Sequence, residues 1–232
     1  DGERSPIDFS LGKVELSRHL IAEWSRLMYA QIRSLYDGQL GNAFETEGHG
    51  PLRESIVLHL RRTRGVDANP QDIVIVNGSQ QAITLLVQLL IHPGDEVITE
   101  DPHYTGVRRA IHAAGGVIRS CPVDRDGIGF DALDSVCAST AKLLITTSGR
   151  QFPTGAVLSM SRRLRLLEWA EQFGTVIIED DYDSEFRYKG RPIEPLKALD
   201  RMGRVAFIGT FSRTMLQDIR LAYAVLPSRL AD

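Results

Sequence analysis

Short apolar runs alternate with amphipathic stretches along most of the chain, and this alternation predicts the fold. The apolar runs are predicted to be strands at residues 73–76, 96–99, 117–121, 143–146, 175–178, 205–209 and 221–226. Between them lie predicted helices at residues 80–90, 104–114, 130–137 and 161–173. Repeated strand–helix units with continuously apolar strands indicate an α/β fold, a three-layer sandwich in which helices cover both faces of a mostly parallel sheet.

Two further helices are predicted before the first strand. At residues 16–35, apolar side chains recur every three or four positions, and Ser17 is available as the N-cap. A second helix is predicted at residues 52–63. We interpret residues 1–45 as an N-terminal arm with an amphipathic helix, and residues 46–232 as one large domain.

The composition excludes several classes of protein. With 232 residues, 43% of them hydrophobic, the chain can bury a large single core. Its net charge of −3 gives no electrostatic reason to bind nucleic acid or an anionic membrane. The two cysteines, Cys121 and Cys137, lack metal-ligand spacing and are predicted to be reduced thiols. No apolar stretch is long enough to span a bilayer, and we expect a cytoplasmic protein.

The clearest candidate chemistry follows the predicted strand at residues 175–178. There the apolar run changes abruptly into Glu179, Asp180, Asp181 and Tyr182. In a parallel sheet this places carboxylates at the edge formed by the C-terminal ends of the strands, where ligands bind. A metal site is disfavoured because no histidine lies nearby and the calcium-loop spacing is absent. Asp181, Asp183 and Glu185 are interpreted as a solvated acidic rim without an assigned role.

Two other segments follow predicted strands and open predicted helices. At residues 77–81, Gly78 allows a tight turn, and free amides at the helix start would attract an anion such as phosphate. A plain strand-to-helix turn remains an alternative, and the GxGxxG fingerprint of dinucleotide sites is absent. At residues 101–106, Tyr104 could stack on a heteroaromatic ring or be a half-buried residue at a helix start.

Two more segments, residues 147–155 and 209–221, complete a set that carries a family resemblance. In their order and spacing, the five segments resemble the aminotransferase-like domain of MocR/GabR-type transcription regulators. That domain is the large domain of the aspartate-aminotransferase type, which binds pyridoxal 5'-phosphate. Gln-Phe-Pro-Thr-Gly at residues 151–155 is closer to the regulators than to the enzymes, which carry an asparagine before Pro-Thr-Gly. The resemblance covers residues 45–232.

The resemblance implies a set of contacts for the cofactor. The pyridine nitrogen would pair with Asp180, the ring oxygen would contact Tyr182, and Tyr104 would lie against the ring. The phosphate would be bound by five residues: Ser79, Gln80, Thr210, Ser212 and Arg220. The loop at residues 148–150 departs from the family's Pro-Ser-His, and its Arg150 is a candidate contact for an acidic effector or a solvent-exposed residue.

The main departure from the family is Arg213, which occupies the position of the lysine that forms a Schiff base with the cofactor. A guanidinium has a pKa above about 12, stays protonated and offers no free amine to an aldehyde. We therefore expect covalent attachment and amino-group transfer to be absent or grossly impaired. Pyridoxal phosphate would then be bound without a covalent bond, or its binding would be lost.

Three functions remain open. The first is an effector-sensing domain of a transcription regulator; the second is an aminotransferase, inactive as given; the third is a cofactor-free interaction module. For the first, the resemblance implies a homodimer, an amine or amino-acid-like effector, and DNA binding only through a winged-helix domain outside this chain. It also implies a smaller C-terminal lobe that this sequence lacks. The sequence names neither the effector nor the operator.

Overall fold

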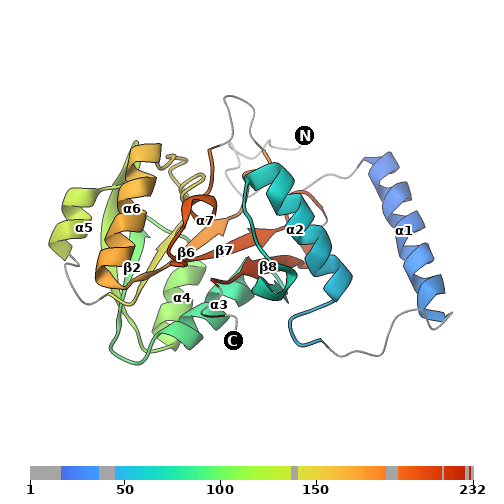
Figure 1. The fold of residues 1–232 in the computed structure, drawn as a ribbon, viewed down its shortest axis with the longest axis horizontal. Helices are drawn as coiled ribbons and strands as arrows, with labels where there is room; N and C mark the ends of the chain where they lie inside the picture. The colour runs from blue at the N-terminus through green and yellow to red at the C-terminus, as the bar shows by residue number, and fades with distance from the viewer. Residues whose placement is uncertain are drawn as a thin grey trace, which may run out of the picture.

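The computed structural model describes residues 17–36, 45–136, 141–186, 193–215, 217–227 and 230. Its centre is an eight-stranded sheet with the order β1-β8-β7-β6-β5-β2-β3-β4 (Figure 1). The strands are β1 (Ile73–Val76), β2 (Glu96–Asp101), β3 (Val117–Asp124), β4 (Gly127–Ile128), β5 (Leu143–Thr146), β6 (Val176–Asp181), β7 (Val205–Thr210) and β8 (Ala222–Val225). The five strands from β7 to β3 are parallel, whereas β1–β8, β8–β7 and β3–β4 pair antiparallel.

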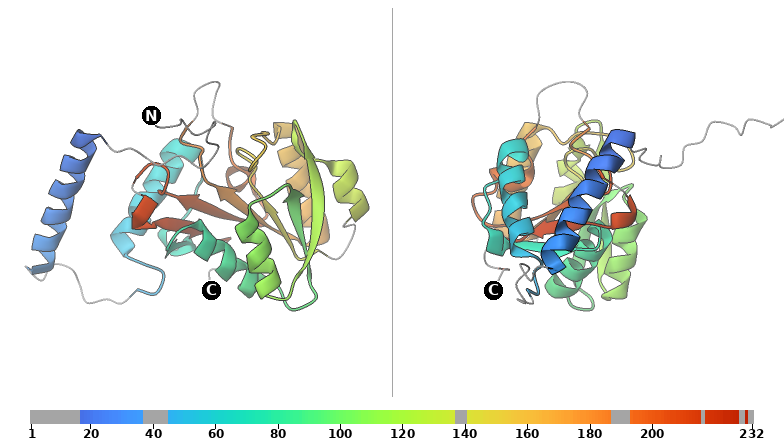
Figure 2. Two further views of the ribbon diagram at one scale, coloured as in Figure 1. Left: turned by 180° about the vertical axis from the view of Figure 1, so that it is seen from behind. Right: turned by 90° about the vertical axis from the view of Figure 1, so that its right-hand side faces the viewer.

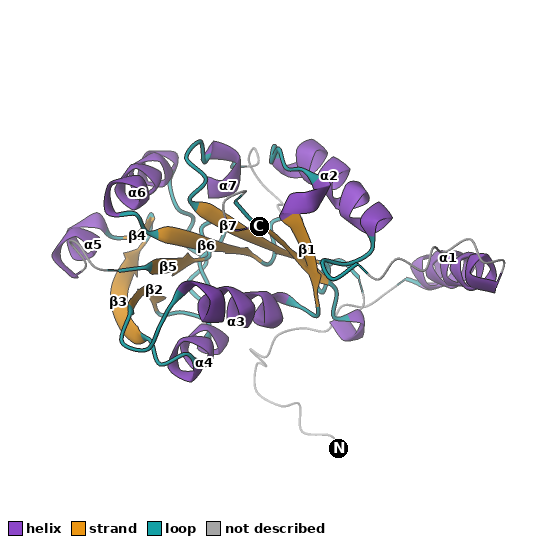
Figure 3. Ribbon diagram, turned by 60° about the horizontal axis from the view of Figure 1, so that its bottom comes forward, coloured by secondary structure: helices purple, strands orange, loops and turns teal. Residues whose placement is uncertain are grey.

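Helices cover both faces of the sheet (Figure 3). Besides α1 (Arg18–Tyr36), they are α2 (Gly50–Arg64), α3 (Ser79–Leu90), α4 (Thr105–Ala113), α5 (Phe130–Val136), α6 (Met160–Phe173) and α7 (Leu196–Leu199), with short 3-10 turns at Pro70–Asp72 and Gln217–Ile219. One face packs against α3 and α4, and the other against α2, α5, α6 and α7. The predicted three-layer α/β sandwich with a mostly parallel sheet is confirmed.

Strand β7 packs against the helices on both faces of the sheet. All six of its residues are buried, as expected for a central strand covered on both faces. Ala206 and Ile208 pack into the core on the α3–α4 side, whereas Val205 and Phe207 pack into cores on the opposite side. Alternate side chains of one strand therefore contribute to different helical layers.

The C-terminal ends of several strands meet along one edge of the sheet. In register, Thr146 of β5 lies beside Glu179 of β6, and Asp180 of β6 lies beside Ile208 of β7. Strand β1 runs in the same direction as β7, because both pair antiparallel with β8. The turn after β1, which leads into α3, therefore reaches the same edge as the acidic end of β6.

The predicted elements differ from the observed ones mainly at their ends. Strand β6 continues to Asp181 and β2 to Asp101, so the carboxylates predicted to follow a strand belong to it. The two-residue strand β4 and the one-turn helix α7 were not predicted, since both are too short for periodicity to identify. Cys121 is buried and its thiol donates a hydrogen bond to the Gly129 carbonyl oxygen at 3.4 Å, whereas Cys137 lies outside the described residues.

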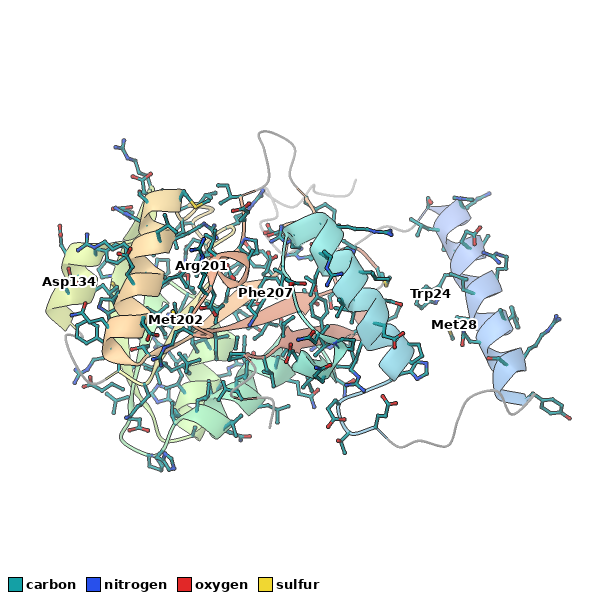
Figure 4. All side chains as sticks on the ribbon, in the orientation of Figure 1. Trp24, Met28, Asp134, Arg201, Met202 and Phe207 are labelled. Atoms are coloured by element: carbon teal, nitrogen blue, oxygen red, sulfur yellow. The ribbon has the colours of Figure 1, made fainter. Side chains whose placement is uncertain are left out.

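Helix α1 stands apart from the sheet and its covering helices (Figure 2). Ser17 is its N-cap, as predicted, because the Ser17 Oγ accepts a hydrogen bond from the Leu20 amide at 3.2 Å. Its apolar residues remain exposed; Leu20, Leu27 and Ile32 are each about half accessible to solvent. In Figure 4, Trp24 and Met28 lie on the side of α1 turned toward α2. Within the described residues, no helix is long and apolar enough to cross a membrane.

Candidate functional site

A cavity of about 190 Å³ opens at the edge where the strands end. It is lined by the eight predicted cofactor contacts, namely Ser79, Gln80, Tyr104, Asp180, Tyr182, Thr210, Ser212 and Arg220, and by Arg213. Gly78, Thr147 and Phe152 complete the lining. Residues from five segments of the chain are thus brought together on one small cavity. Their roles as cofactor contacts stay a prediction.

One end of the cavity is formed by the turn before α3 and by Arg220. Gly78 has a φ of +87°, and a Cβ atom there would lie 2.9 Å from the Arg220 Nη2. The guanidinium therefore packs directly on a turn that glycine alone accommodates without strain. The first turn of α3 also presents backbone N–H groups that no residue within the helix can accept. A guanidinium beside a helix N-terminus is suited to an anion such as phosphate.

Hydroxyl groups extend this anion-binding end. The Thr210 hydroxyl donates to the Ser212 Oγ at 3.1 Å, and the Ser212 amide donates to the Thr210 Oγ1 at 3.2 Å. Arg220 itself has a φ of +54°, and is the single non-glycine residue with positive φ among those the structure describes. Such a backbone costs of order 1–3 kcal/mol and is typically retained at ligand sites. The strain places the Arg220 side chain against Gly78.

Aromatic rings form one wall of the cavity. Phe152 contacts Tyr104 on one side and Tyr182 on the other, edge to face, with centroid distances of 6.1 and 6.0 Å. Gly106 makes room for this arrangement, because a Cβ atom there would lie 2.3 Å from the Tyr104 ring. The sequence predicted both tyrosines but missed Phe152, which lies in the Gln-Phe-Pro-Thr-Gly segment. An apolar wall of this kind suits a flat heteroaromatic ligand.

Asp180 is a buried carboxylate that lines the cavity. It is 7% exposed, and its Oδ1 has no hydrogen-bond partner among the described residues. Burial, together with the nearby carboxylates of Asp181 and Glu100, raises the pKa of Asp180 to about 7. A buried acceptor that faces a cavity and lacks a donor fits a ligand that presents an N–H group. The pyridine nitrogen of pyridoxal phosphate, in its protonated form, is such a donor.

The raised pKa of Asp180 predicts how stability depends on pH. Because this pKa rises from 3.8 to about 7, the folded ligand-free protein binds more protons than the unfolded chain between these values. Its free energy of unfolding should therefore fall as pH rises through this window, by at most on the order of 4 kcal/mol from Asp180. Asp180→Asn should remove that part of the decline. Denaturant unfolding at pH 4.5 and 8 measures it, and parallel profiles for the two proteins would contradict it.

A second buried carboxylate, Glu100, holds the loop that carries Thr147 and Phe152. It accepts hydrogen bonds from the Thr146 hydroxyl at 2.6 Å, from the Thr147 amide at 3.1 Å and from the Thr147 hydroxyl at 2.9 Å. Burial raises the pKa of Glu100. Sequence reasoning missed this residue, although a glutamate that directly follows the apolar run of β2 is a usable signal. Glu100 thus places the loop and adds negative potential near Asp180.

A buried ion pair lies beside this loop. Arg163 of α6 is 1% exposed, and its guanidinium lies 3.6 Å from Glu179 and donates to the Ser148 oxygens at 2.9 and 2.7 Å. Glu179 also accepts hydrogen bonds from the backbone amides of Leu196 and Lys197 at 2.8 and 3.0 Å. The pair therefore joins α6, β6, α7 and the loop after β5. No local pattern in the sequence distinguishes Arg163 from its exposed neighbours.

The interpretation of the acidic cluster as a solvated rim is wrong for Asp181 and Asp183. The Asp181 carboxylate is largely buried and pairs with Arg64 of α2 and with the Ser184 hydroxyl. Asp183 lies 3.2 Å from the Nε of Arg150 and is also mostly covered. Sequence spacing could not show this, because the arginines are distant in the chain or free to turn outward. Among the described residues, no group of three potential ligands is arranged to hold a metal.

Arg213 and Arg150 differ in their relation to the cavity. Arg213 lines the cavity, and its positive charge favours the ionised forms of Tyr182 and Asp183. Burial nevertheless raises the pKa of Tyr182 to about 12, so its hydroxyl keeps its proton and can donate a hydrogen bond. Arg150, the predicted effector contact, pairs with Asp183, is 43% exposed, and is not part of the cavity lining.

Known proteins are similar to this chain over nearly all of its length. MocR of Rhizobium meliloti, described as a probable rhizopine catabolism regulatory protein, is 35% identical over 97% of this chain and 45% of its own length. The chain thus spans about half the length of the curated relatives it matches, several of which are described as HTH-type transcriptional regulators. Whole-protein activities of these relatives do not follow from the match alone.

Two solved aminotransferases share the fold. Kynurenine aminotransferase of Pyrococcus horikoshii superposes with a TM-score of 0.81 at 31% identity, over 90% of this chain and 53% of that one. LysN of Thermus thermophilus, solved with N-(5'-phosphopyridoxyl)-L-leucine, has a TM-score of 0.78 at 29% identity, over 89% and 54%. Residues 6–232 match the family described as aminotransferase class I and II. The chain therefore belongs to the aminotransferase class I and II family, and its relatives include the MocR-type transcription regulators.

Proposed function

We propose that this chain is the effector-sensing domain of a cytoplasmic MocR-type transcription regulator and that it binds pyridoxal 5'-phosphate without a covalent bond. The observation that carries the proposal is the buried Asp180 Oδ1, which has no hydrogen-bond partner among the described residues and lines the same cavity as Arg220. The Asp180 carboxylate is suited to an N–H donor, and the Arg220 guanidinium is suited to an anion. A phosphorylated pyridinium supplies both.

Each residue of the cavity has a distinct part in this proposal. Arg220 and the hydroxyls of Ser79, Thr210 and Ser212 hold the phosphate, and Gln80 closes that end. Asp180 accepts the ring N–H and keeps that proton on the ring. Tyr182 donates to the ring oxygen. When bound, the cofactor supplies an aldehyde that reacts with amines, which is a chemical basis for sensing an amine or amino acid.

The rest of the regulator is also part of the proposal. DNA would be bound by a domain outside this chain, since nothing in the composition of residues 1–232 favours nucleic acid. The effector would be a small amine or an amino-acid-like molecule. Arg150, held by Asp183 outside the cavity lining, remains a candidate contact for its acidic group.

An aminotransferase is the second candidate, favoured by the fold shared with the kynurenine aminotransferase of Pyrococcus horikoshii. Arg213 argues against it, because transfer of an amino group in this family needs the primary amine of a lysine at that position. Amino-group transfer by the unaltered chain, measured with any amino acid and 2-oxo acid pair, would favour the enzyme. A cofactor-free interaction module would bind no pyridoxal phosphate at all.

Arg220→Ala tests the proposed phosphate end of the site. We expect the affinity for pyridoxal phosphate to fall by roughly 1.5–3 kcal/mol, the range for a hydrogen bond to a charged group. Arg61→Ala is a matched control, because Arg61 is 59% exposed, pairs with Asp67 and is not part of the cavity lining. Calorimetric titration of both variants measures the difference. Unchanged affinity in Arg220→Ala would remove this residue from the site.

We also propose that the chain pairs with a second copy through α1. Its apolar residues are exposed although they recur at helical spacing, and covering them would remove a large apolar surface from water. Replacing Leu20 and Leu27 by aspartate should shift a dimer toward monomer in sedimentation experiments. Replacing Arg18 and Arg33, on the same helix, should leave the dimer intact. A monomeric unaltered chain at micromolar concentration would contradict the pairing.

A further inference from the structure

The cavity contains two guanidinium groups, and they lie at different places. Arg220 packs on Gly78, at the end formed by the turn before α3. Arg213 acts electrostatically on Tyr182 and Asp183, which follow β6. Within the described part of the chain, neither guanidinium has a carboxylate within ion-pair distance in the cavity. The site therefore offers two positive charges, with different neighbours, to a ligand in the cavity.

A single phosphate uses only one of these charges. With phosphate at Arg220 and the ring nitrogen at Asp180, the guanidinium of Arg213 is left for a different part of the ligand. Guanidinium has five N–H donors in a planar fork that matches a carboxylate, and it has no nucleophilic lone pair. It would repel a free ammonium group and attract an oxyanion. The residue that prevents covalent attachment is therefore itself a recognition group.

We propose that the cavity selects phosphopyridoxyl compounds whose 4' substituent carries a carboxylate, that is, conjugates of the cofactor with an amino acid, and that Arg213 binds this carboxylate. The inference rests on the proposed function, because it takes the phosphopyridoxyl group as given. It adds the class of molecule that is sensed. An amino acid would be detected as its conjugate with the cofactor, formed in solution by loss of water and bound as one ligand.

The test compares two stable ligands that differ only in the carboxylate. N-(5'-phosphopyridoxyl)-L-leucine has the carboxylate, and the matching conjugate of 3-methylbutylamine has the same alkyl arm without it. Calorimetric titration of the full chain should show roughly 10- to 100-fold tighter binding of the leucine conjugate. In Arg213→Met most of this preference should disappear, because the leucine conjugate binds more weakly while the amine conjugate loses no favourable contact. Thermal melting of both proteins shows whether the variant is folded.

The outcomes separate this inference from the proposed function. Equal affinity of the two conjugates for the unaltered chain would overturn the role of Arg213 while the phosphopyridoxyl site stands. A preference that persists in a folded Arg213→Met variant would also overturn it. If neither conjugate nor pyridoxal phosphate binds, the proposed function fails as well. Should Arg213→Met not fold, the preference must still weaken with added salt in the unaltered chain, and a salt-independent preference would count against Arg213.

Discussion

Replacing Arg213 by lysine should convert non-covalent binding of pyridoxal phosphate into covalent attachment. The cavity is lined by the residues proposed to bind the cofactor, and Arg213 among them offers no primary amine. Lysine supplies that amine, and the pKa of a lysine falls readily when the group is buried. After borohydride reduction, peptide mapping by mass spectrometry should locate the cofactor on residue 213.

Arg213→Gln is the control, because glutamine is polar and of similar length but carries no nucleophilic amine. It should give no adduct at residue 213, and neither should the unaltered chain. An Arg213→Lys variant that binds the cofactor but forms no adduct at residue 213 would show that this residue does not face the reactive group. Attachment without amino-group transfer would favour the sensing domain over the enzyme.

Arg163→Met should be the most destabilising of the single substitutions considered. It removes the cation from a buried pair and leaves the Glu179 carboxylate enclosed with only neutral donors. Breaking a buried pair from one side typically costs about 3–5 kcal/mol of unfolding free energy. Arg162→Met is the comparison in the same helix, since Arg162 is less buried, pairs with a half-exposed Asp124, and its replacement should cost less stability than that of Arg163.

The double variant with Arg163→Met and Glu179→Leu distinguishes two causes of lost stability, the unpaired buried charge of Glu179 and the lost packing of the Arg163 side chain. Without a buried carboxylate to compensate, it should recover part of the stability lost in Arg163→Met. Denaturant unfolding of the four proteins provides the comparison. A loss for Arg163→Met no larger than that for Arg162→Met would contradict the structural role of the pair.

The alternation of apolar strands and amphipathic helices predicted most of this fold. Strands such as β5 and β7 are buried along their whole length and mostly apolar because they are covered on both faces, and such apolar runs are visible without any structure. The antiparallel pairing of β8 with both β1 and β7 could not be predicted, because strand direction is set by contacts distant in sequence. Periodicity also cannot identify elements as short as β4 or α7.

The cavity-lining residues were predictable where the chemistry is local. Gly78 before a helix and Asp180 at the end of a strand each occupy a position with a direct structural meaning. Arg64, Arg163 and Glu100 were missed because their importance depends on partners that are distant in the chain. The same is true of the acidic rim, where Asp181 looks solvated in sequence and is buried against α2 in the fold.

The central claim is that Asp180 accepts a hydrogen bond from the ring nitrogen of a phosphorylated pyridinium. A phosphorylated salicylaldehyde analogue, in which carbon replaces that nitrogen, keeps the phosphate, hydroxyl and aldehyde. Calorimetry should show pyridoxal phosphate binding tighter than this analogue by roughly 1.5–3 kcal/mol, and Asp180→Asn should remove most of that difference. Equal affinities of the unaltered chain for the two compounds would contradict the claim.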